Sequence, residues 1–278
     1  MAINDKLLFK QAISAEMFSP STGEAFWTLD DLKDVNITFS SDSEEKTDAT
    51  NAVIAKYYQA KTAQVTGNTS FFTTSLVAAQ FGSEKKVATS TAKITAPVRE
   101  LIKIGYSSGT TANTTITLSQ IPTGTSGSEI PFIYIIDDKK VMIAKFGVGQ
   151  SASTTKFAVD AANKTITLPT DTSIIKGNYS VLVFYSYETA TAIQLDNNAK
   201  DLPKSGTLWI ECLFTDICDK NIEYHGWIVM NSAQLSPDTE IPLDRTGDFP
   251  FTIDSTVDYC SDGGQILSVI IPEVVAES

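Results

Sequence analysis

Arginine, histidine and cysteine are scarce in this chain of 278 residues. It contains two arginines, Arg99 and Arg245, so one chain cannot build a cluster of guanidinium groups for phosphate or carboxylate. Its three cysteines form no even disulfide framework. No apolar run approaches the roughly 18 residues of a membrane span, and the amino-terminal run is too short for a secretory signal. We therefore expect a soluble protein that folds in a reducing cytoplasm and binds no membrane.

Basic residues are outnumbered, and hydroxyl residues are abundant. The 33 acidic and 21 basic residues give a formal charge of −12, which excludes a uniformly basic nucleic-acid-binding protein. The chain has 34 threonines and 27 serines. Threonine favours strands and serine favours turns, so the composition predicts an all-β fold.

Residues that could carry catalysis or bind a metal are few. The single histidine, His225, stands beside Gly226 and Trp227 without a nucleophile motif, so we interpret it as a residue at a strand end. Cys212, Cys218 and Cys260 could join His225 in a zinc site, but the spacing of Cys212 and Cys218 is not that of a zinc knuckle. We expect structural thiols, and no catalytic, metal or cofactor site.

Two composition zones divide the chain. Residues 97–200 hold eight acidic and nine basic residues, a net charge of +1, whereas the remainder carries −13. Six or seven short strands recur in residues 97–200, which is typical of an immunoglobulin-like β sandwich. We predict that this sandwich, 97–200, is inserted into a discontinuous β domain formed by residues 1–96 and 201–278. Residues 1 to about 24 are interpreted as an arm.

One helix is predicted, in SFFTTSLVAAQFG at residues 70–82. Phe72, Leu76 and Ala79 have helical spacing, Asn68 or Thr69 could cap the start, and Gly82 is a plausible stop. The residues before it, AVIAKYYQAKTAQVTG at 52–67, are rich in β-branched and aromatic side chains and predict a strand.

Acidic side chains gather in two segments of the outer domain. The first, SDSEEKTDATN at 41–51, is interpreted as a solvated loop with four carboxylates: Asp42, Glu44, Glu45 and Asp48. The second is a predicted strand over residues 249–260. In it Asp254 and Asp258 project to the side opposite a predicted apolar face, formed by Phe251, Ile253, Val257 and Tyr259. Asp262-Gly263-Gly264 predicts a hairpin turn before a last strand at 265–273.

These segments together resemble the major tail tube proteins of tailed bacteriophages. The resemblance covers about 170 residues and rests on the acidic stretch, the strand at 52–67, the helix at 70–82 and the closing run GDFPFTIDSTVDYCSDGGQILSVIIPE. The inserted segment resembles the immunoglobulin-like modules of phage structural proteins, in TKFAVDAANKTITLP and GNYSVLVFYSYE. The large insert is a departure from the tail tube pattern.

The resemblance implies a tail-tube-like β sandwich with one flanking helix. It also implies that the chain forms hexameric rings that stack into a tube, with other virion tail proteins as partners and DNA passing through without specific binding. Asp42, Glu44, Glu45 and Asp48 would then lie in an inter-subunit loop, and Asp254 and Asp258 would face the lumen. The expected location is the virion tail, assembled in the host cytoplasm.

Two alternatives stay open. The first is a surface carbohydrate-binding or adhesive β-sandwich module, which normally shows a secretion signal and clustered aromatic residues. Trp27, Trp209 and Trp227 are dispersed along the sequence, which favours the virion interpretation. The second alternative is a head decoration protein of a virion.

Overall fold

The computed structural model describes residues 6–218, 221–258 and 264–272. Within these residues the chain is all-β with one short helix, as the sequence predicted. It divides into two compact units: unit 1 comprises residues 1–85 and 195–278, and unit 2 comprises residues 86–194. Unit 2 therefore interrupts unit 1 in the sequence. The expected boundaries lay at 96/97 and 200/201, and the observed ones are earlier because the short β7–β17 pair, Lys86–Val87 with Ile193–Gln194, belongs with the insert.

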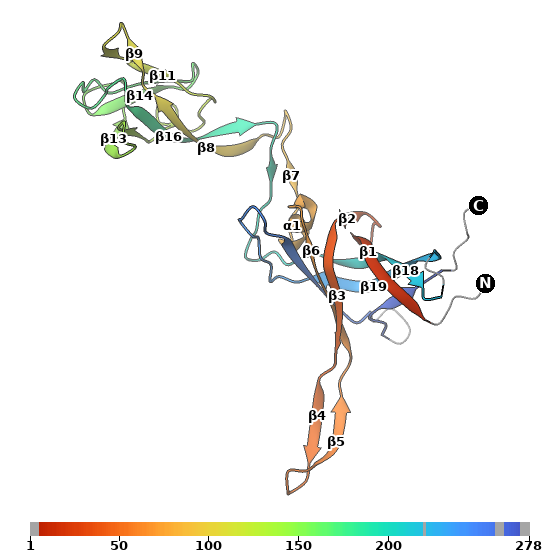
Figure 1. The fold of residues 1–278 in the computed structure, drawn as a ribbon. Helices are drawn as coiled ribbons and strands as arrows, with labels where there is room; N and C mark the ends of the chain where they lie inside the picture. Colours follow the sequence, from red (N-terminus) through yellow and green to blue (C-terminus); the bar gives the residue numbers. More distant parts are fainter. Residues whose placement is uncertain (1–5, 219–220, 259–263, 273–278) are drawn as a thin grey trace. The chain divides into compact units, whose positions relative to one another are not determined.

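Unit 1 is built on one eight-stranded sheet in the order β2-β1-β18-β19-β20-β6-β3, with β21 also paired to β19 (Figure 1). Its strands are β1 (Leu7–Phe18), β2 (Ala25–Leu29), β3 (Leu32–Ser40), β6 (Thr62–Thr69), β18 (Ser205–Asp216), β19 (Glu223–Leu235), β20 (Phe249–Ser255) and β21 (Ser268–Ile270). A separate two-stranded sheet pairs β4 (Ser43–Thr47) with β5 (Val53–Tyr58).

Residues 7–18, which were predicted to belong to an arm, form a strand of the large sheet. Strand β1 pairs along its length with β18 on one side, and its last residues, 15–18, pair with β2 on the other side. Ala15 and Met17 lie in the core at 1% and 0% exposure. Eight of the twelve residues of β1 are apolar, and toward its end the buried Ala15 and Met17 alternate with Ser14 and Glu16, which suits a strand with one buried face. The arm interpretation was therefore wrong.

The core of unit 1 lies on one face of the large sheet. Alternate residues of β18, β19 and β20 point into it, among them Ile210, Met230 and Ile253. The helix α1 (Thr74–Gln80) adds Leu76 and Ala79 to the same core.

Helix α1 is shorter than predicted. Asn68 and Thr69 belong to β6, and the N-cap is Thr73, whose side chain makes no capping bond. Phe72 precedes the helix and is 46% exposed. The predicted stop at Gly82 is confirmed: its φ is +68°, and a Cβ there would lie 2.1 Å from the carbonyl oxygen of Leu202.

Unit 2 is built on a seven-stranded sheet in the order β11-β15-β14-β13-β12-β16-β8. All neighbouring strands are antiparallel except β13 and β14, and its core contains Ile133, Phe157 and Val183. The strands of this sheet are β8 (Ile94–Lys103), β11 (Thr115–Thr117), β12 (Phe132–Ile136), β13 (Met142–Val148), β14 (Lys156–Asp160), β15 (Thr165–Thr167) and β16 (Ser180–Thr189). A separate two-stranded sheet pairs β9 (Tyr106–Ser107) with β10 (Thr111–Ala112).

Candidate assembly surface

Residues 41–61 form a β-hairpin, not the solvated loop that the charges suggested. Strands β4 and β5 pair from Ser43 opposite Tyr58 to Thr47 opposite Val53, and they continue β3 and β6 beyond the large sheet (Figure 1). The predicted strand at 52–67 is therefore two strands, β5 and β6. Local charge led to the loop interpretation, but cross-strand pairing of acidic with basic and aromatic residues makes a strand possible here.

The turn of this hairpin is fixed by Asp48. Its carboxylate accepts hydrogen bonds from the Thr50 hydroxyl at 2.7 Å and from the amides of Thr50 and Ala52 at 2.8 and 3.0 Å. These bonds, led by that of the Thr50 side chain, hold the pKa of Asp48 below its usual value. Asn51 adopts φ +62°, a conformation that asparagine tolerates better than most residues. Asp48 therefore has a structural role in the turn.

The other three acids predicted for this segment lie in or beside β4. Glu45 forms an ion pair with Lys56 across the hairpin at 3.0 Å, and Gln59 donates a hydrogen bond to Glu44 at 3.4 Å. The backbone carbonyl of Asp42 accepts a hydrogen bond from the amide of Gln59 at 2.7 Å. The hairpin is thus an ordered ribbon with acidic residues along one strand.

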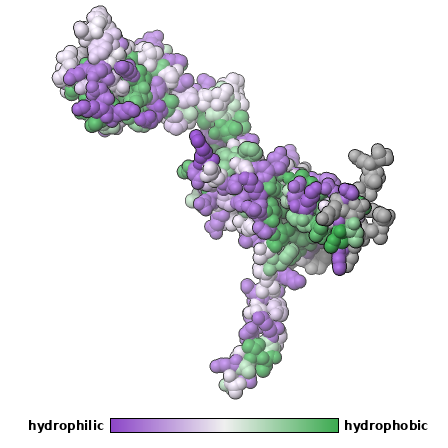
Figure 2. Space-filling model, viewed as in Figure 1, coloured by the Kyte–Doolittle hydropathy of each residue, from purple (hydrophilic) through white to green (hydrophobic). Residues whose placement is uncertain are grey.

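The second strand of the hairpin is apolar and exposed. Ala55 is the single residue between Asp42 and Thr62 that is not exposed. Val53 and Ile54 are 54% and 60% exposed, and Tyr57 and Tyr58 are 61% and 71% exposed. Figure 2 shows apolar side chains gathered toward the far end of this ribbon. An exposed two-stranded ribbon with no core of its own is marginal in water, and its apolar side chains suit contact with another surface.

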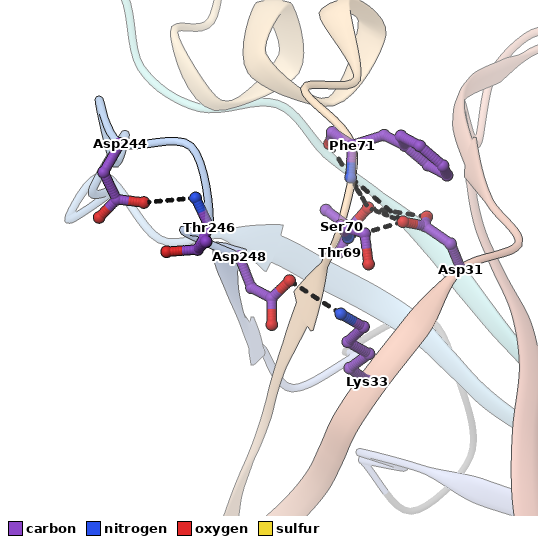
Figure 3. A network of polar contacts seen from close by, with 8 residues as sticks. All are labelled: Asp31, Lys33, Thr69, Ser70, Phe71, Asp244, Thr246 and Asp248. Carbon is purple, nitrogen blue, oxygen red and sulfur yellow. Dashed lines mark hydrogen bonds and ion pairs between the residues drawn. The ribbon is translucent and has the colours of Figure 1, made fainter.

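At the end of β3 and β6 away from the hairpin, the chain is fixed by Asp31, between β2 and β3 (Figure 3). Its carboxylate accepts hydrogen bonds from the Thr69 hydroxyl at 2.7 Å, from the Ser70 amide at 2.6 Å and from the Phe71 amide at 3.2 Å. On the next strand Lys33 forms an ion pair with Asp248 at 2.9 Å. These contacts join the edge strand β3 to β6 and to the segment before β20. The sequence analysis missed Asp31, because its partners lie about 40 residues away.

The two acids predicted to share a strand face do not do so. Asp254 lies in β20, is half-buried, and accepts a hydrogen bond from Gln64 Nε2 at 2.7 Å. Strand β20 ends at Ser255, so Asp258 lies beyond it. Of the apolar face predicted for this segment, Phe251 and Ile253 are buried at 2% and 0% exposure. Tyr259 and the predicted turn residues Asp262 and Gly263 lie outside the described residues.

Aromatic side chains gather on another part of the sheet. The rings of Trp209 and Trp227 lie 6.0 Å apart, and Phe18 contacts Trp209 at 5.2 Å, in each case edge to face. Trp209 is 43% exposed, whereas Trp27 is buried in the core. Two of the three tryptophans are therefore neighbours in space, and their separation in the sequence does not argue against a binding module.

The candidate zinc ligands that the structure describes, Cys212, Cys218 and His225, do not form a cluster. Cys212 is buried, which raises its pKa to about 11, and Cys218 is exposed. His225 contacts Glu211 at 2.8 Å, and Cys260 lies outside the described residues. Among the described residues no group of three potential metal ligands occurs. In the same residues we find no helix with the length and apolarity needed to cross a bilayer.

Comparison of the sequence with protein-family models and with curated proteins finds no match.

Proposed function

We propose that this chain is a structural subunit of a bacteriophage virion, the tail tube protein, which forms hexameric rings stacked around a DNA conduit. The observation that carries the proposal is the β4–β5 hairpin, an ordered ribbon whose Val53, Ile54, Tyr57 and Tyr58 are exposed. A subunit that assembles into rings needs apolar surface that is covered only by its neighbours.

The edges of the large sheet support the same proposal. Strands β2 and β3 end the path of the sheet among the described residues. Open edges present unpaired backbone donors and acceptors to another strand, which is a hazard in a monomer and a means of assembly in a polymer. Edge strands from adjacent subunits would continue the sheet around a ring.

The distribution of charge is consistent with a conduit. With the observed boundaries, unit 1 holds 26 acidic and 11 basic residues, a net charge of −15, whereas unit 2 holds 7 acidic and 10 basic residues, a net charge of +3. Acidic walls repel DNA phosphates and let the genome slide, while basic walls would hold it. We therefore assign unit 1 to the tube and unit 2 to its outer surface.

Negative-stain electron microscopy of the purified full chain tests the proposal. We expect rings or tubes of uniform diameter. A chain that stays monomeric at every concentration would contradict a tube and would favour a surface-binding module.

Asp254 is the acid that we assign to the bore. Its replacement by lysine changes the charge of each subunit by +2 and should create affinity for phosphates, so we expect Asp254→Lys tubes to retain DNA in a salt-sensitive way. DNA retention measured at several salt concentrations checks this, with Asp138→Lys tubes as the control, since this exposed residue of unit 2 gives the same change of charge on the proposed outer surface. Normal tubes of Asp254→Lys that retain no DNA at low salt would place β20 away from the bore.

A further inference from the structure

Unit 2 contains a cleft of about 610 Å³, within the usual range of small-molecule sites of about 300–1,000 Å³. Two segments line it, residues 106–114 after β8 and residues 169–178 before β16. Buried Pro169 and Ile175 give it apolar surface, whereas threonines and asparagines supply hydroxyl and amide groups. The cleft thus combines apolar contact area with polar groups.

Hydrogen bonds between the two segments hold the cleft in shape. The amides of Ile104 and Gly105 donate to the carbonyls of Tyr179 and Gly177 at 2.9 and 3.0 Å. The side-chain amide of Asn113 donates to the carbonyl of Ile104 at 2.8 Å. Because the walls are already tied together, a ligand would not have to order them.

Tyr106 presents an aromatic ring at the cleft. The side chain is 53% exposed, and its hydroxyl donates to Asn178 Oδ1 at 3.5 Å. The ring approaches the backbone of Gly177 so closely that a Cβ there would lie 2.5 Å from Tyr106 Cδ1. Glycine at position 177 is therefore what allows the ring to take this position.

The cleft lies at the free end of a long strand pair. At this end Lys103 of β8 pairs with Ser180 of β16, and at the other end Ile94 pairs with Thr189, near the residues where the chain passes between the units. Ten residues of strand span about 33 Å. The cleft therefore lies a full strand length from the chain crossings.

We infer that this cleft binds a neutral glycan. Sugars present an apolar C–H face that packs on an aromatic ring, and hydroxyls that both donate to and accept from amides and hydroxyls. Tyr106, Asn113, Asn178 and the threonines of the cleft supply these groups. Lys176 is the one charged side chain among the described residues that line it, and its ammonium lies 5.4 Å from the Tyr179 ring. A single cation without arginine is a poor clamp for sulfate or phosphate, so a neutral ligand fits best.

The test uses the full chain in dispersed form, with four probes: neutral trisaccharides of glucose, galactose, mannose and N-acetylglucosamine. Saturation-transfer NMR and titration calorimetry should detect saturable binding of at least one probe. Tyr106→Ala should weaken it about tenfold, since the apolar contact area of the ring is lost. Tyr106→Phe should retain most of the affinity. Phe132→Ala, which removes an exposed ring of β12, is the matched control and should leave affinity unchanged.

Gly177→Ala provides a second arm that leaves the tyrosine in place: its Cβ would lie 2.5 Å from Tyr106 Cδ1 and 2.6 Å from the carbonyl oxygen of Gly105, so it displaces both the ring and the adjoining backbone. We expect this variant to lose affinity as Tyr106→Ala does. The inference is overturned if no probe binds saturably or if Tyr106→Ala binds as well as the original chain. None of these outcomes depends on tube assembly.

Discussion

Asp31 joins the start of the edge strand β3 to the residues at the end of β6. Its half-buried carboxylate accepts hydrogen bonds from two backbone amides and one hydroxyl of residues 69–71. Hydrogen bonds to a charged group contribute more to folding stability than those between neutral groups. Its neighbour Asp30 is exposed. These adjacent aspartates therefore make a matched pair for mutation.

We predict that Asp31→Ala lowers the free energy of unfolding of unit 1 by about 2 kcal/mol, since the amides of Ser70 and Phe71 lose their acceptor. Asp30→Ala should change it by less than about 0.5 kcal/mol. Tryptophan fluorescence during urea unfolding reports on unit 1 alone, because all three tryptophans lie in it. Equal effects of the two substitutions would show that the Asp31 contacts contribute little.

At the scale of elements, the β4–β5 hairpin links sequence to assembly. Because side chains alternate along a strand, Ile54, Lys56 and Tyr58 project from the same side of β5. Two apolar side chains therefore share that side. Serine at both apolar positions removes contact area from an exposed ribbon while leaving both cores untouched.

We predict that Ile54→Ser/Tyr58→Ser abolishes rings and tubes and leaves the unfolding midpoint of unit 1 unchanged. Sedimentation velocity measures the first effect, and tryptophan fluorescence measures the second. Lys46→Ser, an exposed change on the opposite strand, is the control and should assemble normally. Tubes formed by the double variant in normal yield would exclude this side of the hairpin from the subunit contact.

Periodicity predicted most strands, since β18, β19 and unit 2 have buried faces that leave an alternating pattern. It failed where burial does not decide the structure. Strand β4 is exposed on both sides, so its sequence shows charge and no period, whereas β5 was predicted as part of the strand at 52–67 from its β-branched and aromatic residues. The strand predicted over residues 249–260 runs past Ser255, where β20 ends, because the alternation continues beyond the residue at which its pairing stops. Asp31 and the cleft of unit 2 depend on contacts distant in sequence, which no local pattern reveals.

At the scale of the whole molecule, the chain carries two separate cores. The carbonyl of Ala192 accepts from the amide of Ala88 at 2.8 Å, so the two chain crossings run side by side next to β7 and β17. A short turn can therefore replace most of the insert without separating the ends of unit 1.

We predict that replacing residues 89–191 with a short Gly/Ser turn leaves ring formation intact, and that residues 86–194 fold alone. Electron microscopy of the deletion variant and NMR of the excised unit measure the two outcomes. Loss of rings together with an insoluble excised unit would mean that unit 2 is needed for the tube.

Amide hydrogen exchange of residues 42–62, compared between dispersed and assembled full-length chain, tests whether neighbouring subunits cover the hairpin. The hairpin is exposed in the single chain, and we propose that neighbouring subunits cover it in the tube. We predict fast exchange in the dispersed chain and strong protection in the assembled one, while β18 stays protected in both. Exchange in the hairpin that is equally fast in both forms would contradict the account.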